Sequence, residues 1–90
     1  MPIIKFTHHL QRFFPTLAPQ SIPGQTVAEI IQELDRRYPG LAAYIVDEQG
    51  GLRKHVNIFV DGELIQDRQS LQDAVSEAEV VYIFQALSGG

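Results

Sequence analysis

The sequence contains no cysteine, and this absence excludes several kinds of chemistry at once. Thiol nucleophiles, disulfides, iron–sulfur clusters and zinc sites built on cysteine are all ruled out. No apolar run approaches the ~20 residues of a membrane-spanning helix, and the first residues do not resemble a signal peptide. We therefore expect a cytoplasmic protein that does not bind membranes.

Positive charge is also scarce. Seven basic side chains stand against eleven acidic ones, and the formal net charge at pH 7 is −4. The basic side chains are adjacent only at Arg36-Arg37 and Arg53-Lys54, so we expect no nucleic-acid partner. The sequence also lacks a P-loop and a dinucleotide-binding fingerprint. We expect the chain itself to bind no cofactor.

Three histidines remain as candidates for a metal site. His8 and His9 are adjacent, and neighbouring residues on a strand point to opposite faces, so they are poorly placed to share one ion. Zinc needs three or four convergent ligands, and His55 is distant in the sequence, so no metal site is expected and the histidines are predicted to face solvent. Asp73 and Glu77 have no cleft that suits paired acid–base carboxylates, and we interpret them as solvated.

Ninety residues make one domain, and its clearest element is a helix over residues 26–38. The stretch "TVAE" is a capping box, in which Thr26 accepts from the Glu29 N–H while Glu29 reaches back to the cap. Apolar residues recur at helical spacing, and Pro39-Gly40 ends the helix. The apolar stripe consists of Val27, Ile30, Ile31 and Leu34.

The other elements are short. Residues 2–6 predict a first strand, and residues 16–22 predict a second strand that prolines confine to a sheet edge, within an otherwise irregular segment 8–25. The stretch "HVNIFVDGELI" predicts a hairpin with a type I′ turn at Asp61-Gly62. Residues 41–46 predict a helical turn, residues 70–75 another that carries Leu71 and Val75 inward, and residues 79–87 the last strand.

This element order predicts an α+β fold of the β-grasp (ubiquitin-like) type, a mixed sheet of four to five strands packed on one main helix. If Val81 and Ile83 face the helix, Tyr82 and Phe84 face away from it. Two interpretations of these exposed aromatic side chains remain open. They pack across strands, for example with Phe59, or they form a surface that binds a partner.

The last strand runs into "ALSGG", where the sequence ends in two glycines. We expect residues 1–85 to form the domain and residues 86–90 to form a flexible tail, which spans roughly 16–18 Å when extended. Such a tail can enter a cleft in another protein, and glycine passes where any Cβ would collide. It offers the α-carboxylate of Gly90. Attack of that carboxylate on the α-phosphate of ATP gives a mixed anhydride, with Mg²⁺ and basic residues supplied by the partner, so the chain is expected to be a substrate and not an enzyme.

Four stretches together resemble the MoaD/ThiS family of ubiquitin-like sulfur carriers. They are "IPGQTVAEIIQEL", "RYPGL", "HVNIFVDGELI" and "VVYIFQALSGG", in family order and over most of residues 22–90. The long middle segment is more similar to the MoaD-type branch. Before the last strand, "SEAEV" departs from the Asp-Gly-Asp/Glu turn common in the family.

The resemblance implies that an E1-like enzyme adenylates Gly90, and that a persulfide or sulfide then displaces AMP to leave a thiocarboxylate. This group donates sulfur to a synthase in molybdopterin (molybdenum cofactor), thiamine thiazole, cysteine or tRNA biosynthesis. By position, Gly89 and Gly90 are the pair threaded into the enzyme, Phe84 belongs to the docking face, and Leu87 and Ser88 line the entry. Two alternatives stay open: a ubiquitin-like modifier joined to lysines through Gly90, and a β-grasp interaction module whose tail is inert.

Overall fold

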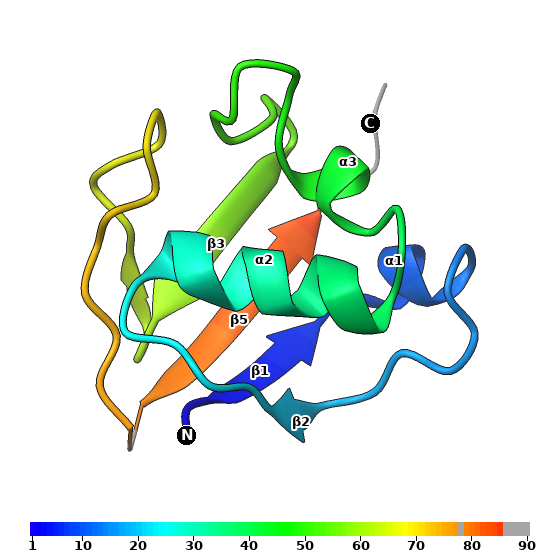
Figure 1. Cartoon of the computed structure of the whole chain (residues 1–90), viewed down its shortest axis with the longest axis horizontal. Coiled ribbons are helices and arrows are strands. Elements are labelled where there is room, and N and C mark those ends of the chain that lie inside the picture. The colour runs from blue at the N-terminus through cyan, green and yellow to red at the C-terminus, as the bar shows by residue number, and fades with distance from the viewer. Residues whose placement is uncertain (78, 86–90) are drawn as a thin grey trace.

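The computed structural model describes residues 1–77 and 79–85. Five strands of this part form one mixed sheet in the order β2-β1-β5-β3-β4, and the main helix α2 crosses one face of it (Figure 1). The elements in chain order are β1 (Ile3–Phe6), α1 (His8–Gln11), β2 (Gln20–Ser21), α2 (Val27–Arg37), α3 (Ala42–Ile45), β3 (Val56–Val60), β4 (Glu63–Leu64) and β5 (Val80–Gln85). The predicted mixed sheet on one main helix is confirmed.

Strand β5 lies at the centre of the sheet. It pairs in parallel with β1 and antiparallel with β3, so the first and last strands described are neighbours. Val81 lies opposite Ile4, and Ile83 lies opposite Ile58. All four side chains are fully buried in the core, and for Val81 and Ile83 this confirms the alternation predicted along the last strand.

Helix α2 begins at the predicted cap. The Glu29 N–H donates to Thr26 Oγ1 at 3.2 Å, whereas the Glu29 carboxylate accepts from the Gln25 N–H at 2.9 Å, one residue before the predicted partner. Gly40, with φ of +95°, follows the C-cap at Tyr38. The apolar stripe of Val27, Ile30, Ile31 and Leu34 is buried against the sheet.

The predicted hairpin is confirmed in both its strands and its turn. Phe59 lies opposite Leu64, and Val60 lies opposite Glu63. Asp61 and Gly62 connect them with φ of 53° and 87°. Positive φ at both central residues defines a type I′ turn, whose twist matches that of the flanking strands.

The segment of residues 8–25 was predicted to be irregular, and this was wrong at its start. Residues His8–Gln11 form α1, a single turn whose N-cap makes no side-chain hydrogen bond. Its anchor is Leu10, which is fully buried in the core. The edge strand is confirmed but short, because β2 covers only Gln20–Ser21.

The helical turn predicted over residues 70–75 was also wrong. The chain makes a turn at residues 68–70, and Leu71 then takes a φ of +56°, which no right-handed helix allows. Leu71 and Val75 are nevertheless buried, as predicted. Of the helices in residues 1–77 and 79–85, none has the length and apolar character needed to span a membrane.

Candidate functional site: the open face of β5 and the tail root

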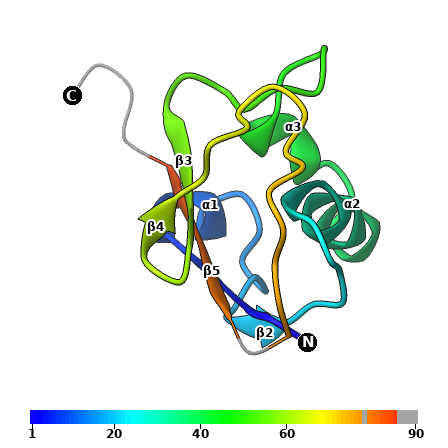
Figure 2. The same cartoon turned by 90° about the vertical axis from the view of Figure 1, so that its left-hand side faces the viewer.

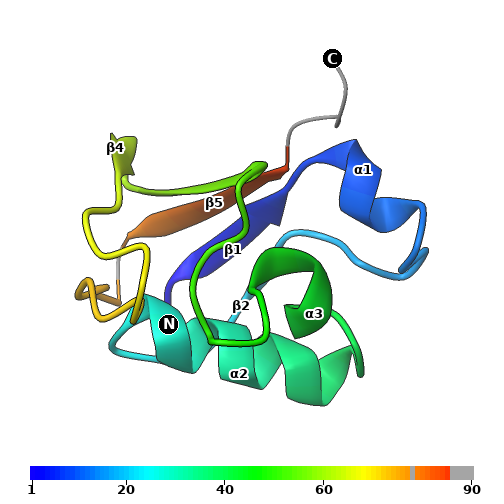
Figure 3. The ribbon, with the colours of Figure 1, turned by 90° about the horizontal axis from the view of Figure 1, so that it is seen from above.

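One face of the sheet carries a group of apolar side chains that no helix covers within the described part of the chain. Helices α2 and α3 lie together on the opposite side (Figures 2 and 3). Residues opposite each other in a ladder share a face, which defines the open-face patch. It consists of Ile3, Phe59, Leu64, Val80, Tyr82 and Phe84.

The patch is partly packed and partly accessible. Tyr82 lies opposite Phe59 and stacks on Phe84, with ring centroids 6.3 Å apart. Phe84 lies opposite Asn57 instead of an aromatic residue, and 40% of its surface remains exposed. Leu64 is 51% exposed. Cross-strand packing therefore accounts for Tyr82 and Phe59, while Phe84 and Leu64 leave apolar surface accessible to a partner.

The end of β5 is held on both sides. On one side Gln85 lies opposite Val56 of β3. On the other, the Gln85 N–H donates to Thr7 Oγ1 and the Thr7 N–H donates to the Ile83 carbonyl, each at 3.3 Å. We call Gln85 and the residues that contact it the tail root. The chain is thus fixed up to the last residue described before the predicted tail.

The remaining predicted site residues lie outside the described part of the structure. These are Leu87, Ser88, Gly89 and Gly90. Their roles, and the boundary between a domain of residues 1–85 and a tail of residues 86–90, stay predictions. Of the predicted site residues, the structure places Phe84, on the open face next to the tail root.

The histidines lie differently from the prediction, because His8 and His9 are on α1 and not on a strand. His8 is exposed and its Nδ1 is 3.2 Å from Gln11 Oε1. His9 is only half-exposed, packs edge-on to Phe13 at 5.8 Å between ring centroids, and buries its Nδ1 without a hydrogen-bond partner in the described structure. The prediction that all the histidines face solvent was therefore wrong for His9. Residues 1–77 and 79–85 contain no group of three side chains arranged to hold a metal ion.

Glu77 is exposed, as predicted, but the prediction that Asp73 is solvated was wrong, because Asp73 is only half-exposed and has a structural role. The Asp73 carboxylate accepts from the backbone N–H groups of Gln66 and Asp67 at 3.0 and 2.8 Å. Sequence analysis missed Asp67, whose carboxylate accepts from the backbone N–H groups of Gln69, Ser70 and Gln72 and holds the turn before Leu71. These hydrogen bonds, chiefly those from Ser70 and Gln72, lower the pKa of Asp67 below its ordinary value.

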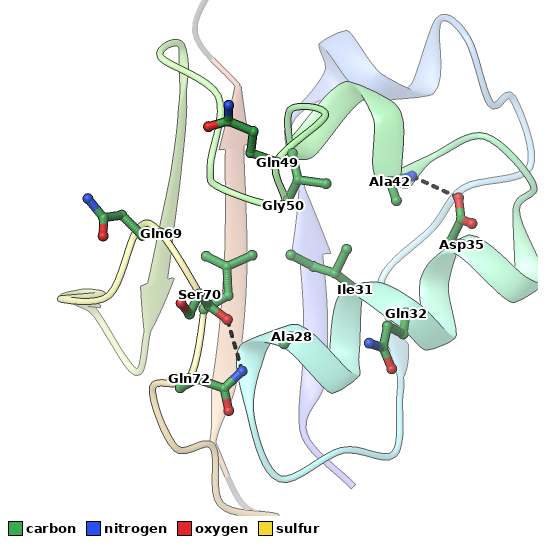
Figure 4. Close-up of a pocket in the computed structure, with 12 residues that line it drawn as sticks. Ala28, Ile31, Gln32, Asp35, Ala42, Gln49, Gly50, Gln69, Ser70 and Gln72 are labelled. Atoms are coloured by element: carbon green, nitrogen blue, oxygen red, sulfur yellow. Dashed lines mark hydrogen bonds between the residues drawn. The ribbon is translucent and has the colours of Figure 1, made fainter.

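A cleft of about 420 Å³ lies between α2, α3 and the loop of residues 69–72 (Figure 4). Carboxamide side chains from Gln32, Gln49, Gln69 and Gln72 surround it. Asp35 is the carboxylate in its lining, and it already accepts from the backbone N–H groups of Gly40 and Ala42 at 3.2 and 3.0 Å. The lining contains no histidine, lysine or cysteine, and the Ser70 hydroxyl has no base beside it there, so we assign this cleft no catalytic role.

Sequence comparison finds relatives of this chain among known proteins. The sulfur carrier protein CysO of Mycobacterium tuberculosis is 31% identical over 72 residues, which cover 78% of this chain and 77% of CysO. Small archaeal modifier protein 3 of Haloferax volcanii is 28% identical over 65 residues, which cover 72% of this chain and 70% of that protein.

Solved structures show the same fold. A chain of the Amycolatopsis orientalis BexX/CysO complex superposes with a TM-score of 0.86 at 24% identity, over the whole of both chains. CysO of Mycobacterium tuberculosis superposes with a TM-score of 0.83 at 24% identity, over 97% of this chain and 100% of CysO. The predicted β-grasp fold is confirmed. The family model for the ThiS family matches residues 6–90, and the chain therefore belongs to the ThiS family.

Proposed function

We propose that this protein is a sulfur carrier, whose Gly90 carboxylate is adenylated by an E1-like partner enzyme and converted to a thiocarboxylate. One observation carries the proposal: the family match runs through Gly90, the residue whose carboxylate reacts. The similarity to CysO, which is named a sulfur carrier protein, supports the same function.

The proposed chemistry has two steps. An oxygen of the Gly90 carboxylate attacks the α-phosphate of ATP, and pyrophosphate leaves. Sulfide then attacks the acyl carbon and AMP leaves, so that sulfur replaces one oxygen; with a persulfide donor, a further thiol cleaves the resulting acyl disulfide. The partner supplies ATP, Mg²⁺ and the groups that stabilise phosphoryl charge. The chain acts as co-substrate, and a downstream synthase accepts the sulfur.

The described residues contribute docking and position. Phe84 and Leu64 offer exposed apolar surface on the open face, which suits contact with the activating enzyme. The hydrogen bonds between Thr7 and the end of β5 fix where the tail sequence begins relative to that surface. Gly89 and Gly90, without side chains, allow a narrow entry to the partner's active site.

A second function follows from one specific similarity. Small archaeal modifier protein 3 is named a modifier, and its similarity to this chain favours conjugation as the second candidate. The acyl-adenylate chemistry is shared: a lysine amine in place of sulfide opens the activated carbonyl and forms an isopeptide bond. The two functions differ only in the nucleophile that the partner system delivers.

Intact-mass measurement after incubation with ATP, Mg²⁺, sulfide and the cognate E1-like enzyme tests both functions. Replacement of one oxygen by sulfur at Gly90 is the result expected for a sulfur carrier, and lysine-linked adducts in lysate are expected for a modifier. A variant with one residue added after Gly90 should fold normally and remain unmodified, because the reacting carboxylate is displaced. Thiolation of that variant without trimming contradicts the proposed site, and the absence of both products contradicts both functions.

A further inference from the structure

Acidic side chains lie near the start of the central strand β5. At the start of β5, the Asp61 N–H donates to the Val80 carbonyl at 2.7 Å and the Val80 N–H lies 3.4 Å from Asp61 Oδ1. Further acidic residues lie near this end: Glu63 on β4, and Glu79 just before β5. The other end of β5, about 17 Å away at ~3.3 Å per residue, has exposed cations near it, while Asp47 and Glu48 in the loop before β3 lie beside Arg53.

Cationic residues follow or precede the segments on both sides of the tail root. Because Val56 lies opposite Gln85, Lys54 lies just before the start of β3, beside the end of β5. On the other side, Thr7 binds Gln85 and leads directly into α1 (Figure 1), and Arg12 is the C-cap of that helix. Lys5 is further from the tail root: it lies on β1 opposite Tyr82, on the open face and three residues before Gln85 along β5. All three cations are exposed, and we call Lys5, Arg12 and Lys54 the cationic collar.

The collar residues differ from the other four basic residues in having no partner within the described chain. Arg36 and Arg37 form ion pairs with Glu33 on α2. The remaining two make hydrogen bonds within the chain. Arg68 donates to Asn57 Oδ1 and to two backbone carbonyls. Arg53 donates to the Ala43 carbonyl and lies beside Asp47 and Glu48. Within residues 1–77 and 79–85, no carboxylate lies within 4.0 Å of a collar cation.

The length of the tail sequence determines which surface meets a partner. Five residues reach at most ~18 Å, so Gly90 can enter an active site only if the surface around Gln85 comes within that distance of its mouth. The collar therefore faces the partner whenever Gly90 reacts. Cations brought into an interface lose hydration, and this cost is offset when acidic groups lie opposite them.

We propose that the collar docks on an acidic rim around the cleft of the activating enzyme that receives the tail. This inference rests on the proposed function and specifies the chemistry of its partner. The acidic residues near the start of β5 lie at the far end of the strand from that contact. An acidic surface on the enzyme would repel this end and attract the collar, and so orient the domain as it approaches the enzyme. Charge arranged in this way raises the association rate and makes it sensitive to salt.

Charge reversal at the collar tests the inference. Lys54→Glu and Arg12→Glu each change the net charge by two units, and Arg36→Glu makes the same change on α2, at a side chain that is 71% exposed. The quantity to measure is kcat/KM for ATP–pyrophosphate exchange with the cognate E1-like enzyme, at about 50 and 300 mM salt. Each collar variant should lose about tenfold at low salt and less at high salt. Arg36→Glu should lose less than about twofold, and Lys54→Arg should match the unaltered protein.

Two results overturn the inference, and a third separates it from the proposed function. Equal losses for Arg36→Glu and Lys54→Glu would show a general effect of net charge. Unchanged rates and unchanged salt dependence in both collar variants would show that the collar does not meet acidic groups. If the unaltered protein is thiolated in either case, the proposed function stands and only the inference fails; if it is not thiolated, both fail. Thermal unfolding of each variant verifies that the fold is retained.

Discussion

Truncation of Phe84 to alanine should weaken activation without unfolding the domain. Phe84 is 40% exposed, and a phenylalanine side chain presents ~200 Å², so about 80 Å² remains for a partner to cover. At ~25 cal/mol per Å² this surface contributes about 2 kcal/mol to docking, which corresponds to about a 30-fold lower kcat/KM for ATP–pyrophosphate exchange. Phe84→Leu should lose only part of this, because most of the apolar surface remains.

A core variant tests whether lost stability alone slows activation. Phe84→Ala should itself cost about 2–3 kcal/mol of unfolding free energy, because more than half of Phe84 is covered within the domain. Ile31→Val removes one buried methyl group from α2, away from the open face, and should cost about 1 kcal/mol. It should be activated at the rate of the unaltered protein. A normal rate for Phe84→Ala, or an equal loss for Ile31→Val, would refute the assignment of the open face as the docking surface.

Three further predictions concern stability. Ile83→Ala removes three carbons from a fully buried position, and should lower the free energy of unfolding by about 3–4 kcal/mol and the melting temperature by about 15 °C or more; a fall below about 5 °C contradicts the core packing. Gly24→Ala places a Cβ 2.9 Å from Ile30 Cδ1 and 3.2 Å from Ile30 N, and should cost about 1 kcal/mol, whereas an unchanged urea midpoint contradicts this close approach. Hydrogen bonds from Arg36 and its neighbour lower the pKa of Glu33 from 4.5 to about 2. The stabilisation that the ionised Glu33 carboxylate contributes is therefore present above pH 4.5 and is lost as the pH falls toward 2. In urea titrations, the difference in unfolding free energy between Glu33→Gln and the unaltered protein should narrow over that range. A difference that stays constant with pH contradicts this role of Glu33.

The sequence predicted the elements whose signals are local. The Asp61-Gly62 pair marked the hairpin because its turn needs positive φ at both residues, and the structure has φ of 53° and 87° there. Helix α1 carried no such signal, since it is held by the burial of Leu10 in a core that forms only with the whole fold. Likewise, the positive φ of Leu71 follows a turn organised by Asp67, and the amides that Asp67 binds were not evident from residue type.

The candidate site was predicted in part for the same reason. Alternation along the last strand placed Phe84 on the open face, but its neighbour across the sheet depends on the register of two distant strands. That register puts Tyr82, not Phe84, opposite Phe59. The collar arises in the same way, because Lys54 comes to the end of β5 only through the pairing of Val56 with Gln85.

The parallel pairing of β1 with β5 has a consequence for how the protein is made. The partner of β1 lies about 75 residues downstream, so the two strands can pair only after nearly the whole chain has been synthesised. The middle of the sheet therefore forms last and depends on contacts of long sequence separation. A chain interrupted before β5 lacks the strand that joins β1 to β3, so the sheet that covers the apolar side of α2 cannot close. Chains truncated before β5 should therefore remain unfolded and be degraded. They would not compete with the complete domain for the proposed activating enzyme.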